Sequence, residues 1–426
     1  MPRCEILVNR AYSAVQSLIF RFSEGRMRRT STRLGVVLVH ALLAACGGSS
    51  GGLAPVEPSA PTTTIDQPTT LDLYPNESSE NPARLTVIVT AVGSLAVSMP
   101  LGFDTGSAGI TLYAPSIFPA SMLGADGFIF PSGETQMTYQ GVTVTNQQGT
   151  RTYGSVLDNR NENGNLGFAT VTFGDANGEV TTQTMPVFLY YSITDNQTGD
   201  LVPEPTQQGW FGVASTAGSI VVPGSVEPAA GYPACSSTSV GTCFVVSVLK
   251  YIGYAAGVDA GFSLAPTGIQ ICDIATPGSC VAAPVLTLGL NSNLEAGYTT
   301  QPLICPPNGY LGPADIAGYP VCQKTILHTT ISALGESVTG YSLFDTGTAG
   351  MRISTPAGSN FPAVIPVGTT VTFAQSAGFS YSYTTDTGYF NTIVEPDTTT
   401  VNVIGIGFFT TNSMFIDFTT STEGWK

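Results

Sequence analysis

The feature that most constrains the fold of this chain is an internal repeat. Residues 85–115, LTVIVTAVGSLAVSMPLGFDTGSAGITLYAP, match residues 325–356, TILHTTISALGESVTGYSLFDTGTAGMRISTP. Each copy has an alternating apolar strand, a Gly-containing turn, a second alternating strand and the string F-D-T-G-[ST]-A-G, followed by another β-rich run. Two copies are too few for a solenoid, which needs three or more stacked units. The repeat therefore predicts a duplicated domain whose two lobes are related by pseudo-twofold symmetry.

The composition of the chain favours a large, sheet-rich, exported protein. The chain has 48 glycines and only 10% charged residues, and it is rich in Thr, Val and Ser, which suits strands better than helices. Seven of the 14 basic residues and 2 of the 29 acidic residues precede Cys46, which leaves a net charge of −20 on the rest of the chain. At that charge we expect no nucleic-acid binding.

The N-terminal region has the pattern of an export signal. Residues 1–26 have no clear periodicity, and we interpret them as an upstream extension from a misassigned start. From Met27 a basic segment precedes an apolar run over 34–43 and a small-residue cleavage site, which predicts a signal peptide over residues 27–45. The apolar run is about ten residues long, too short for the roughly 20 needed to cross a bilayer.

The string LAAC, which ends at Cys46, resembles the lipobox of bacterial lipoproteins. The resemblance implies cleavage before Cys46 and lipidation of its thiol, and Gly47 in the next position implies anchoring at the outer membrane. The alternative is an ordinary secretory signal with an incidental cysteine.

Beyond the signal we divide the chain into a tether and two lobes. Residues 46–70 are rich in Gly, Ser, Pro and Thr and predict a flexible tether. Residues 71–230 are the predicted N-terminal lobe, residues 231–324 a cysteine-containing interlobe segment, and residues 325–426 the predicted C-terminal lobe.

Six cysteines follow the tether, and they lie as neighbours along the sequence. An even number in an exported chain indicates disulfides, although six cysteines can pair in several ways. We predict the three local pairs Cys235–Cys243, Cys272–Cys280 and Cys305–Cys322. Only one histidine, His328, follows Cys46, and no CxxC is present, so we expect no metal site.

A second matched pair of strings accompanies the repeat. An apolar-apolar-Gly string follows each DTG copy, WFG ending at Gly212 and VIG ending at Gly405. Together, the paired DTG strings and the paired Gly turns resemble the pepsin-like aspartic peptidases. This resemblance implies an all-β fold of two lobes, with few short helices, in which Asp104 and Asp345 meet at the lobe interface as the catalytic pair.

The resemblance also assigns roles to the residues that follow each aspartate. Such residues must be small or hydroxylated for two loops to approach closely. The implied roles are amide donors to the carboxylates for Gly106 and Gly347, hydrogen bonds to the opposite loop for Thr105 and Thr346, and hydrogen bonds to the outer carboxylate oxygens for Ser107 and Thr348. The alternative for all of them is turn chemistry and core packing.

A third DTG, at Asp386, has no apolar strand before it. We interpret it as a hairpin turn, which is a common use of Asp-x-Gly.

A flap that closes over the substrate is predicted from residues 152–157, TYGSVL, with Tyr153 at its tip and Gly154 beside it. We interpret the asparagine-rich run 158–165 as a solvated hairpin tip. In the pepsin-like family a Trp partners the flap Tyr and would fall near Thr111, where this chain has none. That departure argues against a working flap.

The function that the resemblance implies is that of an aspartic endopeptidase, in which Asp104 and Asp345 activate a water without any cofactor or metal. Activity is then expected at acidic pH, on bonds between apolar residues of a peptide or protein substrate. We expect a monomer that contacts the membrane only through its lipid anchor. The alternatives are an inactive lipoprotein that keeps the fold for binding or structure, and a peptidase dedicated to one partner or to its own precursor.

Overall fold

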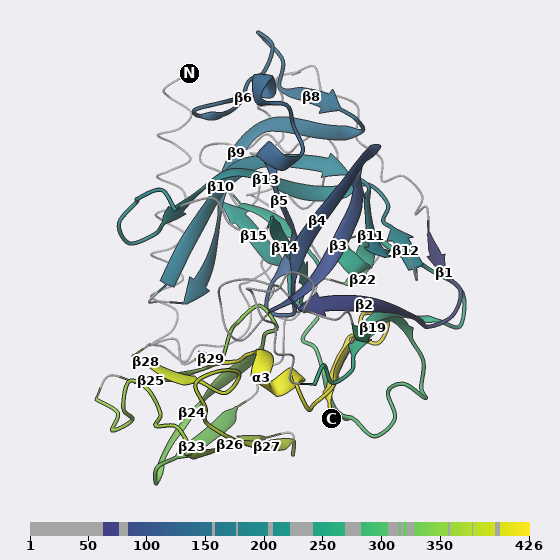
Figure 1. The fold of residues 1–426 in the computed structure, drawn as a ribbon. Helices are drawn as coiled ribbons and strands as arrows, with labels where there is room; N and C mark the ends of the chain where they lie inside the picture. The colour runs from purple at the N-terminus through teal and green to yellow at the C-terminus, as the bar shows by residue number, and fades with distance from the viewer. Residues whose placement is uncertain are drawn as a thin grey trace, which may run out of the picture. The chain divides into compact units, whose positions relative to one another are not determined.

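The computed structural model describes residues 63–75, 84–155, 158–175, 178–202, 208–221, 242–268, 283–305, 315–316, 319–320, 322, 328–356, 358–376, 378–396 and 401–426. These residues are mostly β-strand (Figure 1). Helix within them is limited to the single turn α3 (Ile406–Phe409) and the 3-10 turns η2 (Ala114–Ser116), η3 (Ala120–Met122) and η4 (Val248–Tyr251). Across this part of the chain, no helix has the length and apolar character needed to cross a membrane.

The first copy of the repeat folds into a hairpin and an interleaved set of strands. Strands β3 and β4 pair antiparallel around a turn that contains Gly93, whose φ of +61° is left-handed. Strand β14 lies between β4 and β5, parallel to the first and antiparallel to the second, and β13 continues parallel to β5. The bounds are β3 (Leu85–Val92), β4 (Leu95–Asp104), β5 (Ala108–Tyr113), β13 (Met185–Asp195) and β14 (Gly209–Val213).

The second copy repeats this arrangement strand for strand. Strands β23 and β24 form the hairpin, β29 lies between β24 and β25 with the same parallel and antiparallel pairings, and β28 is parallel to β25. Figure 1 shows these strands together in green to yellow. The bounds are β23 (Thr329–Ala333), β24 (Glu336–Phe344), β25 (Met351–Thr355), β26 (Thr370–Gln375), β27 (Ser380–Thr384), β28 (Thr392–Pro396) and β29 (Val401–Ile404).

The N-terminal lobe is extended by strands that the second copy does not have. The long strands β9 and β10 form a hairpin, and β10 also pairs with β13. The remaining strands flank this hairpin and the first copy of the repeat. Their bounds are β8 (Gln136–Tyr139), β9 (Val142–Ser155), β10 (Asp158–Ala169), β11 (Val171–Asp175), β12 (Gly178–Thr181), β15 (Gly218–Val221) and β16 (Thr242–Val245).

A further antiparallel sheet of six strands draws on three distant parts of the chain. Its order is β20-β31-β30-β18-β19-β2, and β2 also pairs with β3 of the N-terminal lobe. The bounds are β2 (Thr69–Pro75), β18 (Asp259–Leu264), β19 (Ala283–Leu290), β20 (Thr299–Pro302), β30 (Met414–Asp417) and β31 (Thr422–Trp425). Three short pairs complete the described strands, namely β1 (Thr64–Ile65) with β17 (Gly253–Tyr254), β6 (Leu123–Gly124) with β7 (Gly127–Phe128), and β21 (Asp315–Ile316) with β22 (Tyr319–Pro320).

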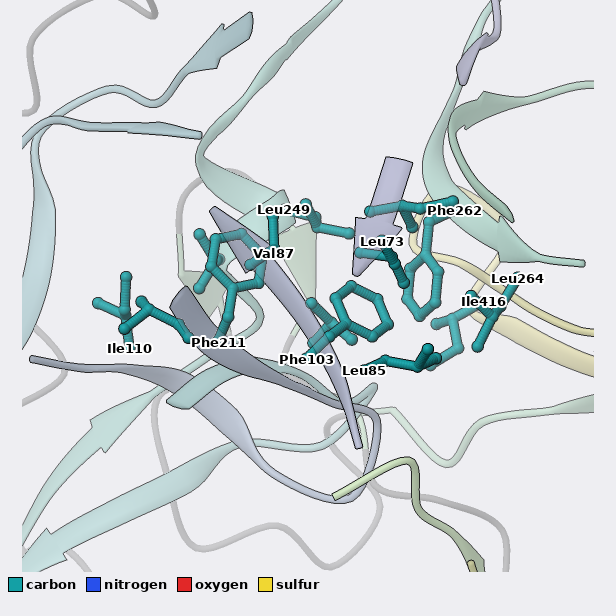
Figure 2. Packing of buried hydrophobic residues seen from close by; sticks show 14 of the residues in the cluster. Leu73, Leu85, Val87, Phe103, Ile110, Phe211, Leu249, Phe262, Leu264 and Ile416 are labelled. Atoms are coloured by element: carbon teal, nitrogen blue, oxygen red, sulfur yellow. The ribbon is translucent and has the colours of Figure 1, made fainter. Parts of the chain in front are cut away.

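The hydrophobic core joins each repeat to this six-stranded sheet. Phe103, at the end of β4, packs in a T-shaped contact with Phe262 of β18, with ring centroids 6.0 Å apart, and also lies against Phe211 of β14 (Figure 2). In the second lobe, Phe344 at the end of β24 packs against Trp425 of β31. The residue directly before each aspartate therefore packs against buried aromatic rings, which hold the end of its strand in place.

The tether predicted over residues 46–70 extends too far into the chain. Residues 64–65 form β1, and β2 begins at Thr69. Ile65 is buried and gives this polar segment an apolar residue to bury, while the parallel pairing with β17 satisfies its backbone.

The predicted solvated tip at 158–165 is also wrong. These residues belong to β10, which pairs on both sides, and Asn165 is fully buried. The side-chain amide of Asn165 donates to the Thr145 carbonyl, and Glu162 is buried in the same strand. The polar side chains are tolerated because neighbouring groups in the sheet bond to them.

The third DTG is a turn, but not a hairpin. The Asp386 carboxylate accepts hydrogen bonds from the amides of Gly388 and Phe390, at 2.7 and 2.8 Å. The strands on either side, β27 and β28, are not paired with each other.

The predicted lipidation site and two of the predicted disulfides fall outside the described residues. These are Cys46 and the pairs Cys235–Cys243 and Cys272–Cys280, for which at most the backbone of Cys243 is described. The Cys305–Cys322 disulfide is present.

The strand pairings confirm the predicted fold class as an all-β architecture of two lobes. Each lobe contains one copy of the repeat, and each copy ends its second strand at an Asp-Thr-Gly string. The two strings meet, as the contacts below show.

Candidate active site

The two DTG loops bond to each other through a reciprocal set of hydrogen bonds. The Thr105 hydroxyl donates to the Phe344 carbonyl at 2.9 Å, and the Thr346 hydroxyl donates to the Phe103 carbonyl at 2.6 Å. Each hydroxyl also accepts from the amide of the other threonine, at 3.1 Å in both directions. Both side chains are fully buried. This exchange joins the lobes about an approximate twofold axis, in the manner expected for Thr105 and Thr346.

The two carboxyl groups lie together above these threonines. A β-carbon placed on Gly347 would lie 3.0 Å from the Oδ1 atoms of both Asp104 and Asp345, so the two oxygens are at most twice that distance apart. Burial and then the nearby charge of Asp104 raise the pKa of Asp345. The structure thus brings together the two aspartates that the repeat singled out.

Each carboxylate is held by donors from its own loop. The Gly106 amide donates to Asp104 Oδ1 at 2.7 Å, and the Ser107 hydroxyl donates to Oδ2. In the second lobe the Gly347 amide donates to Asp345 Oδ1 at 2.7 Å, and the Thr348 hydroxyl donates to Oδ2 at 2.6 Å. These contacts fix both carboxyl planes without a metal or a basic side chain.

Burial and proximity together raise the pKa of Asp345 well above its usual range. Removal from water is the largest cause, followed by the charge of Asp104 and the hydrogen bond between them, while the Thr348 hydroxyl and the Gly347 amide oppose the shift. Two carboxyls this close cannot both ionise cheaply, which favours the protonated form of Asp345. The two titration steps belong to the pair and not to either residue alone.

Two glycines are needed for the carboxyl groups to approach. A β-carbon on Gly106 would lie 2.5 Å from Asp345 Cγ, and one on Gly347 would lie 2.9 Å from Asp104 Cγ. Each DTG glycine therefore leaves room for the aspartate of the opposite lobe.

The glycines of the later turn strings have a supporting role. A β-carbon on Gly212 would lie 2.7 Å from the Gly109 carbonyl oxygen, and one on Gly405 would lie 1.9 Å from the Gly350 carbonyl oxygen. Gly109 and Gly350 each lie five positions after an aspartate, so the close packing is the same in both lobes. Gly212 and Gly405 hold the strand after each DTG loop against its neighbour.

Tyr153, at the tip of the predicted flap, lies in the β9–β10 hairpin and contacts a Trp. The ring of Tyr153 in β9 packs edge-on against Trp210 of β14, with centroids 5.8 Å apart. Trp210 lies opposite Thr111 in the antiparallel pairing of β14 and β5, and its amide donates to the Thr111 hydroxyl. Trp210 thus reaches Tyr153 from the strand beside Thr111, although no Trp lies near Thr111 in the sequence. The clue in the sequence was Trp210 itself, within the WFG string.

One strand of this hairpin carries a buried glutamate. Glu162 of β10 is 1% exposed, pairs across the hairpin with Arg151 of β9, and accepts a hydrogen bond from the Thr111 hydroxyl. Burial raises the pKa of Glu162 to about 7, although the charge of Arg151 and the hydrogen bond from Thr111 oppose the rise. Sequence analysis did not single out this residue, because the asparagine-rich run around it resembled a loop.

A cleft of about 310 Å³ contains the two aspartates. Its walls are the DTG loops, residues 151–154 of β9 with Tyr153 and Gly154, Trp210, and Leu343, Arg352 and Val403 of the second lobe. Among the described residues, the walls include none from the interlobe segment 231–324. No group of three or more His, Cys, Asp or Glu side chains in the described part of the chain could hold a metal ion.

Comparisons with known proteins give a similarity in structure only. No family model matches the chain, and no curated protein matches it in sequence. Among solved structures, the chain is similar to the crystal structure of the aspartic proteinase from Irpex lacteus, with 12% identity and a TM-score of 0.47, over 84% of this chain and 97% of that one.

Proposed function

We propose that this chain is an aspartic endopeptidase that hydrolyses peptide bonds with a water activated by Asp104 and Asp345. The observation that carries the proposal is the close approach of the two carboxyl groups, each held by matching donors from its own DTG loop. A lone DTG has no such partner, as the turn at Asp386 illustrates.

The proposed mechanism needs no group beyond the two carboxyls. One carboxylate, ionised, takes a proton from a water held between the pair, and the resulting hydroxide attacks the peptide carbonyl. The protonated carboxyl donates its proton to the developing oxyanion, and the tetrahedral intermediate collapses as the leaving nitrogen is protonated. The shared proton makes one base and one acid available at the same time.

The contact between Tyr153 and Trp210 supports a substrate-covering role for the β9–β10 hairpin. Tyr153 and Gly154 line the cleft that contains the aspartates. A hairpin in this position excludes water and orients a peptide bound across the carboxyls. The missing Trp was one of the arguments for an inactive binding protein, and the contact with Trp210 answers that one.

The test is cleavage of an unfolded protein mixture across pH 3–8 by the full-length chain in mild detergent, compared with Asp104→Asn and Asp345→Asn. We expect both variants to lose activity by at least about a thousandfold, because each removes one half of the acid–base pair. Asp386→Asn is the matched control, since it changes an aspartate of the same DTG string that lies in an unpaired turn.

The outcomes separate the candidates clearly. Loss in both dyad variants with activity retained in Asp386→Asn supports the two-carboxylate mechanism. A folded wild type that cleaves nothing, or dyad variants that cleave like wild type, contradicts it and favours the binding or structural alternative.

We also propose that the chain is a lipoprotein anchored through Cys46, exported and held at the outer membrane. The LAAC string motivates the proposal, and the Cys305–Cys322 disulfide fits an oxidising compartment. Labelled fatty acid should be incorporated by wild type and not by Cys46→Ser, with Cys4→Ser as the control. Labelling that persists in Cys46→Ser would contradict the assignment.

A further inference from the structure

The charges that line the cleft differ from those of the rest of the chain. After Cys46 the chain has seven basic residues against 27 acidic ones, and only four of the seven are arginines. All four of these arginines, Arg84, Arg151, Arg160 and Arg352, line the cleft that contains the two aspartates. Among the described lining residues, the only carboxyl groups are those of the aspartate pair, which share one proton.

The arginines reach the cleft from both lobes. Arg84 immediately precedes β3, and Arg151 and Arg160 lie on the two strands of the flap hairpin, with Arg160 directly opposite Tyr153. Arg352 comes from β25 of the second lobe. A peptide that lies between the lobes therefore passes guanidinium groups on both walls.

Three of the arginines interact with carboxylates that do not line the cleft. Arg352 forms an ion pair with Glu395, Arg151 interacts with Glu162, and Asp195 lies close enough to Arg160 for its pKa to be lowered in part by that charge. None of the three carboxylates is among the cleft-lining residues. A guanidinium has five N–H donors and can bond to more than one acceptor at a time.

Two of the arginines are held in ways that suit ligand binding. The Arg84 guanidinium lies over the Trp210 ring, 5.6 Å from its centroid, and stacking of this kind orients the guanidinium plane. Arg151 is 7% exposed, its Nη2 donates to the Ala108 carbonyl, and its buried Nη1 has no hydrogen-bond partner among the described residues. A buried guanidinium nitrogen without a partner beside a cleft is costly unless a ligand bonds to it.

We infer that the cleft selects peptide segments that contain Asp or Glu side chains near the cleaved bond. The inference rests on the proposed peptidase function and replaces the expectation of a preference for apolar residues. Arginine forks pair with carboxylates in a geometry that an uncharged amide cannot reproduce.

The state of Glu162 adds to this preference in mildly acidic solution. Below a pH of about 7 this buried carboxyl is protonated, and the charge of Arg151 is no longer compensated from behind. Substrate carboxylates, with pKa values of about 4, remain ionised down to that range. Selection should therefore be strongest at a pH of roughly 5 to 6 and weaken towards pH 3.5, as the substrate side chains become protonated.

The test compares quenched fluorescent peptides that differ only by Glu against Gln, or Asp against Asn, at single positions around the cleavage site. Both termini are blocked, and one Gln peptide with a free carboxyl terminus tests for recognition of a terminal carboxylate instead. For the full-length chain at pH 5.5 we expect kcat/KM for the acidic peptide to exceed that for its amide by about tenfold, and the ratio to fall with added salt.

Variants show whether the cleft arginines are responsible. Arg84→Gln combined with Arg160→Gln should reduce the Glu/Gln ratio to about twofold or less, since two of the charged hydrogen bonds are lost. The control Lys426→Gln changes net charge at a residue that does not line the cleft and should keep the wild-type ratio. Partial recovery of the ratio in the double lysine variant would support a role for charge.

The outcomes for this inference and for the peptidase proposal are distinct. Cleavage of amide and acidic peptides at equal rates, or faster cleavage of the amides, overturns the inference and leaves the peptidase proposal intact. Preference for the free-terminus peptide alone also overturns it. If no peptide is cleaved, the peptidase proposal fails, and calorimetric binding of the same peptides to Asp104→Asn then decides the inference, which requires tighter binding of the acidic member.

Discussion

Replacing Thr346 by Val should destabilise the chain far more than its change in shape would suggest. Valine nearly matches threonine in volume, so the packing of this fully buried side chain is retained. What is lost is the hydroxyl, which donates to the Phe103 carbonyl at 2.6 Å and accepts from the Thr105 amide at 3.1 Å. Two buried backbone groups are left unpaired, at a cost of about 1–3 kcal/mol each.

The expected loss in the free energy of unfolding is therefore about 2–5 kcal/mol, a large part of the roughly 5–15 kcal/mol of a typical domain. Thr105→Val should cost a similar amount, because its hydroxyl makes the reciprocal pair of bonds. We expect the double variant to cost less than the sum, since the first loss already loosens the contact between the loops.

The assay is urea unfolding followed by circular dichroism, with hydrogen exchange of peptides that cover residues 103–107 and 344–348. Thr339→Val is the matched control, because Thr339 is an exposed strand residue whose hydroxyl pairs only with Thr330. If Thr346→Val shifts the unfolding free energy by no more than this control, below about 0.5 kcal/mol, the reasoning about the crossed hydrogen bonds is refuted.

Three further changes test other parts of the site. Trp210→Phe should lower kcat/KM about tenfold, mainly through KM, because the smaller ring supports the flap less well. The free energy of unfolding should fall by only about 1 kcal/mol. Unchanged kinetics would exclude a supporting role for Trp210. Gly106→Ala should reduce activity at least about a hundredfold, since the new methyl would lie 2.5 Å from Asp345 Cγ. The control Gly388→Ala, whose methyl would meet nothing nearer than 3.8 Å, should leave activity unchanged. Equal effects of the two substitutions on activity would contradict the steric argument. The pKa of Glu162 is about 7 when folded against an ordinary value of 4.5, so its stabilising contribution is complete below about pH 4.5 and is lost as pH rises through 7. The melting temperature of the wild type should therefore fall between pH 5 and 8, and Glu162→Gln should reduce this fall. Parallel curves of melting temperature against pH for the variant and the wild type would disprove the role of Glu162.

The duplicated part of the fold follows directly from the sequence because its determinants are local. Alternating apolar residues and a Gly turn define β3 and β4 within 20 residues, and the same pattern recurs in β23 and β24. Once both copies end in Asp-Thr-Gly, the family resemblance is enough to expect the loops to meet.

The partner of the flap Tyr could not be found in the same way. Tyr153 and Trp210 are far apart in sequence, and their contact depends on the register of β14 against β5. Side chains paired across antiparallel strands share one face of the sheet, so a ring can reach the same place from either strand. The residues around Thr111 do not indicate which side chain lies opposite it on the neighbouring strand.

The asparagine-rich strand illustrates how tertiary contacts override local preference. Asn and Gly favour turns in isolation, yet residues 158–165 lie between β9 and β13, and the side-chain amide of Asn165 donates to the Thr145 carbonyl. The six-stranded sheet was equally hidden, because no local pattern indicates that β2, β18 and β30 belong together.

That six-stranded sheet also determines when the chain can finish folding. Its strands include residues 69–75 and residues 414–425, and Phe344, directly before Asp345, packs on Trp425. Contacts of such long sequence separation form slowly, and a chain emerging from a ribosome or a translocation channel cannot make them until its distant strands have emerged. We therefore expect the carboxyl pair to be completed only after residues 414–425 have reached the compartment in which the protein folds, so the order of synthesis delays the appearance of the site.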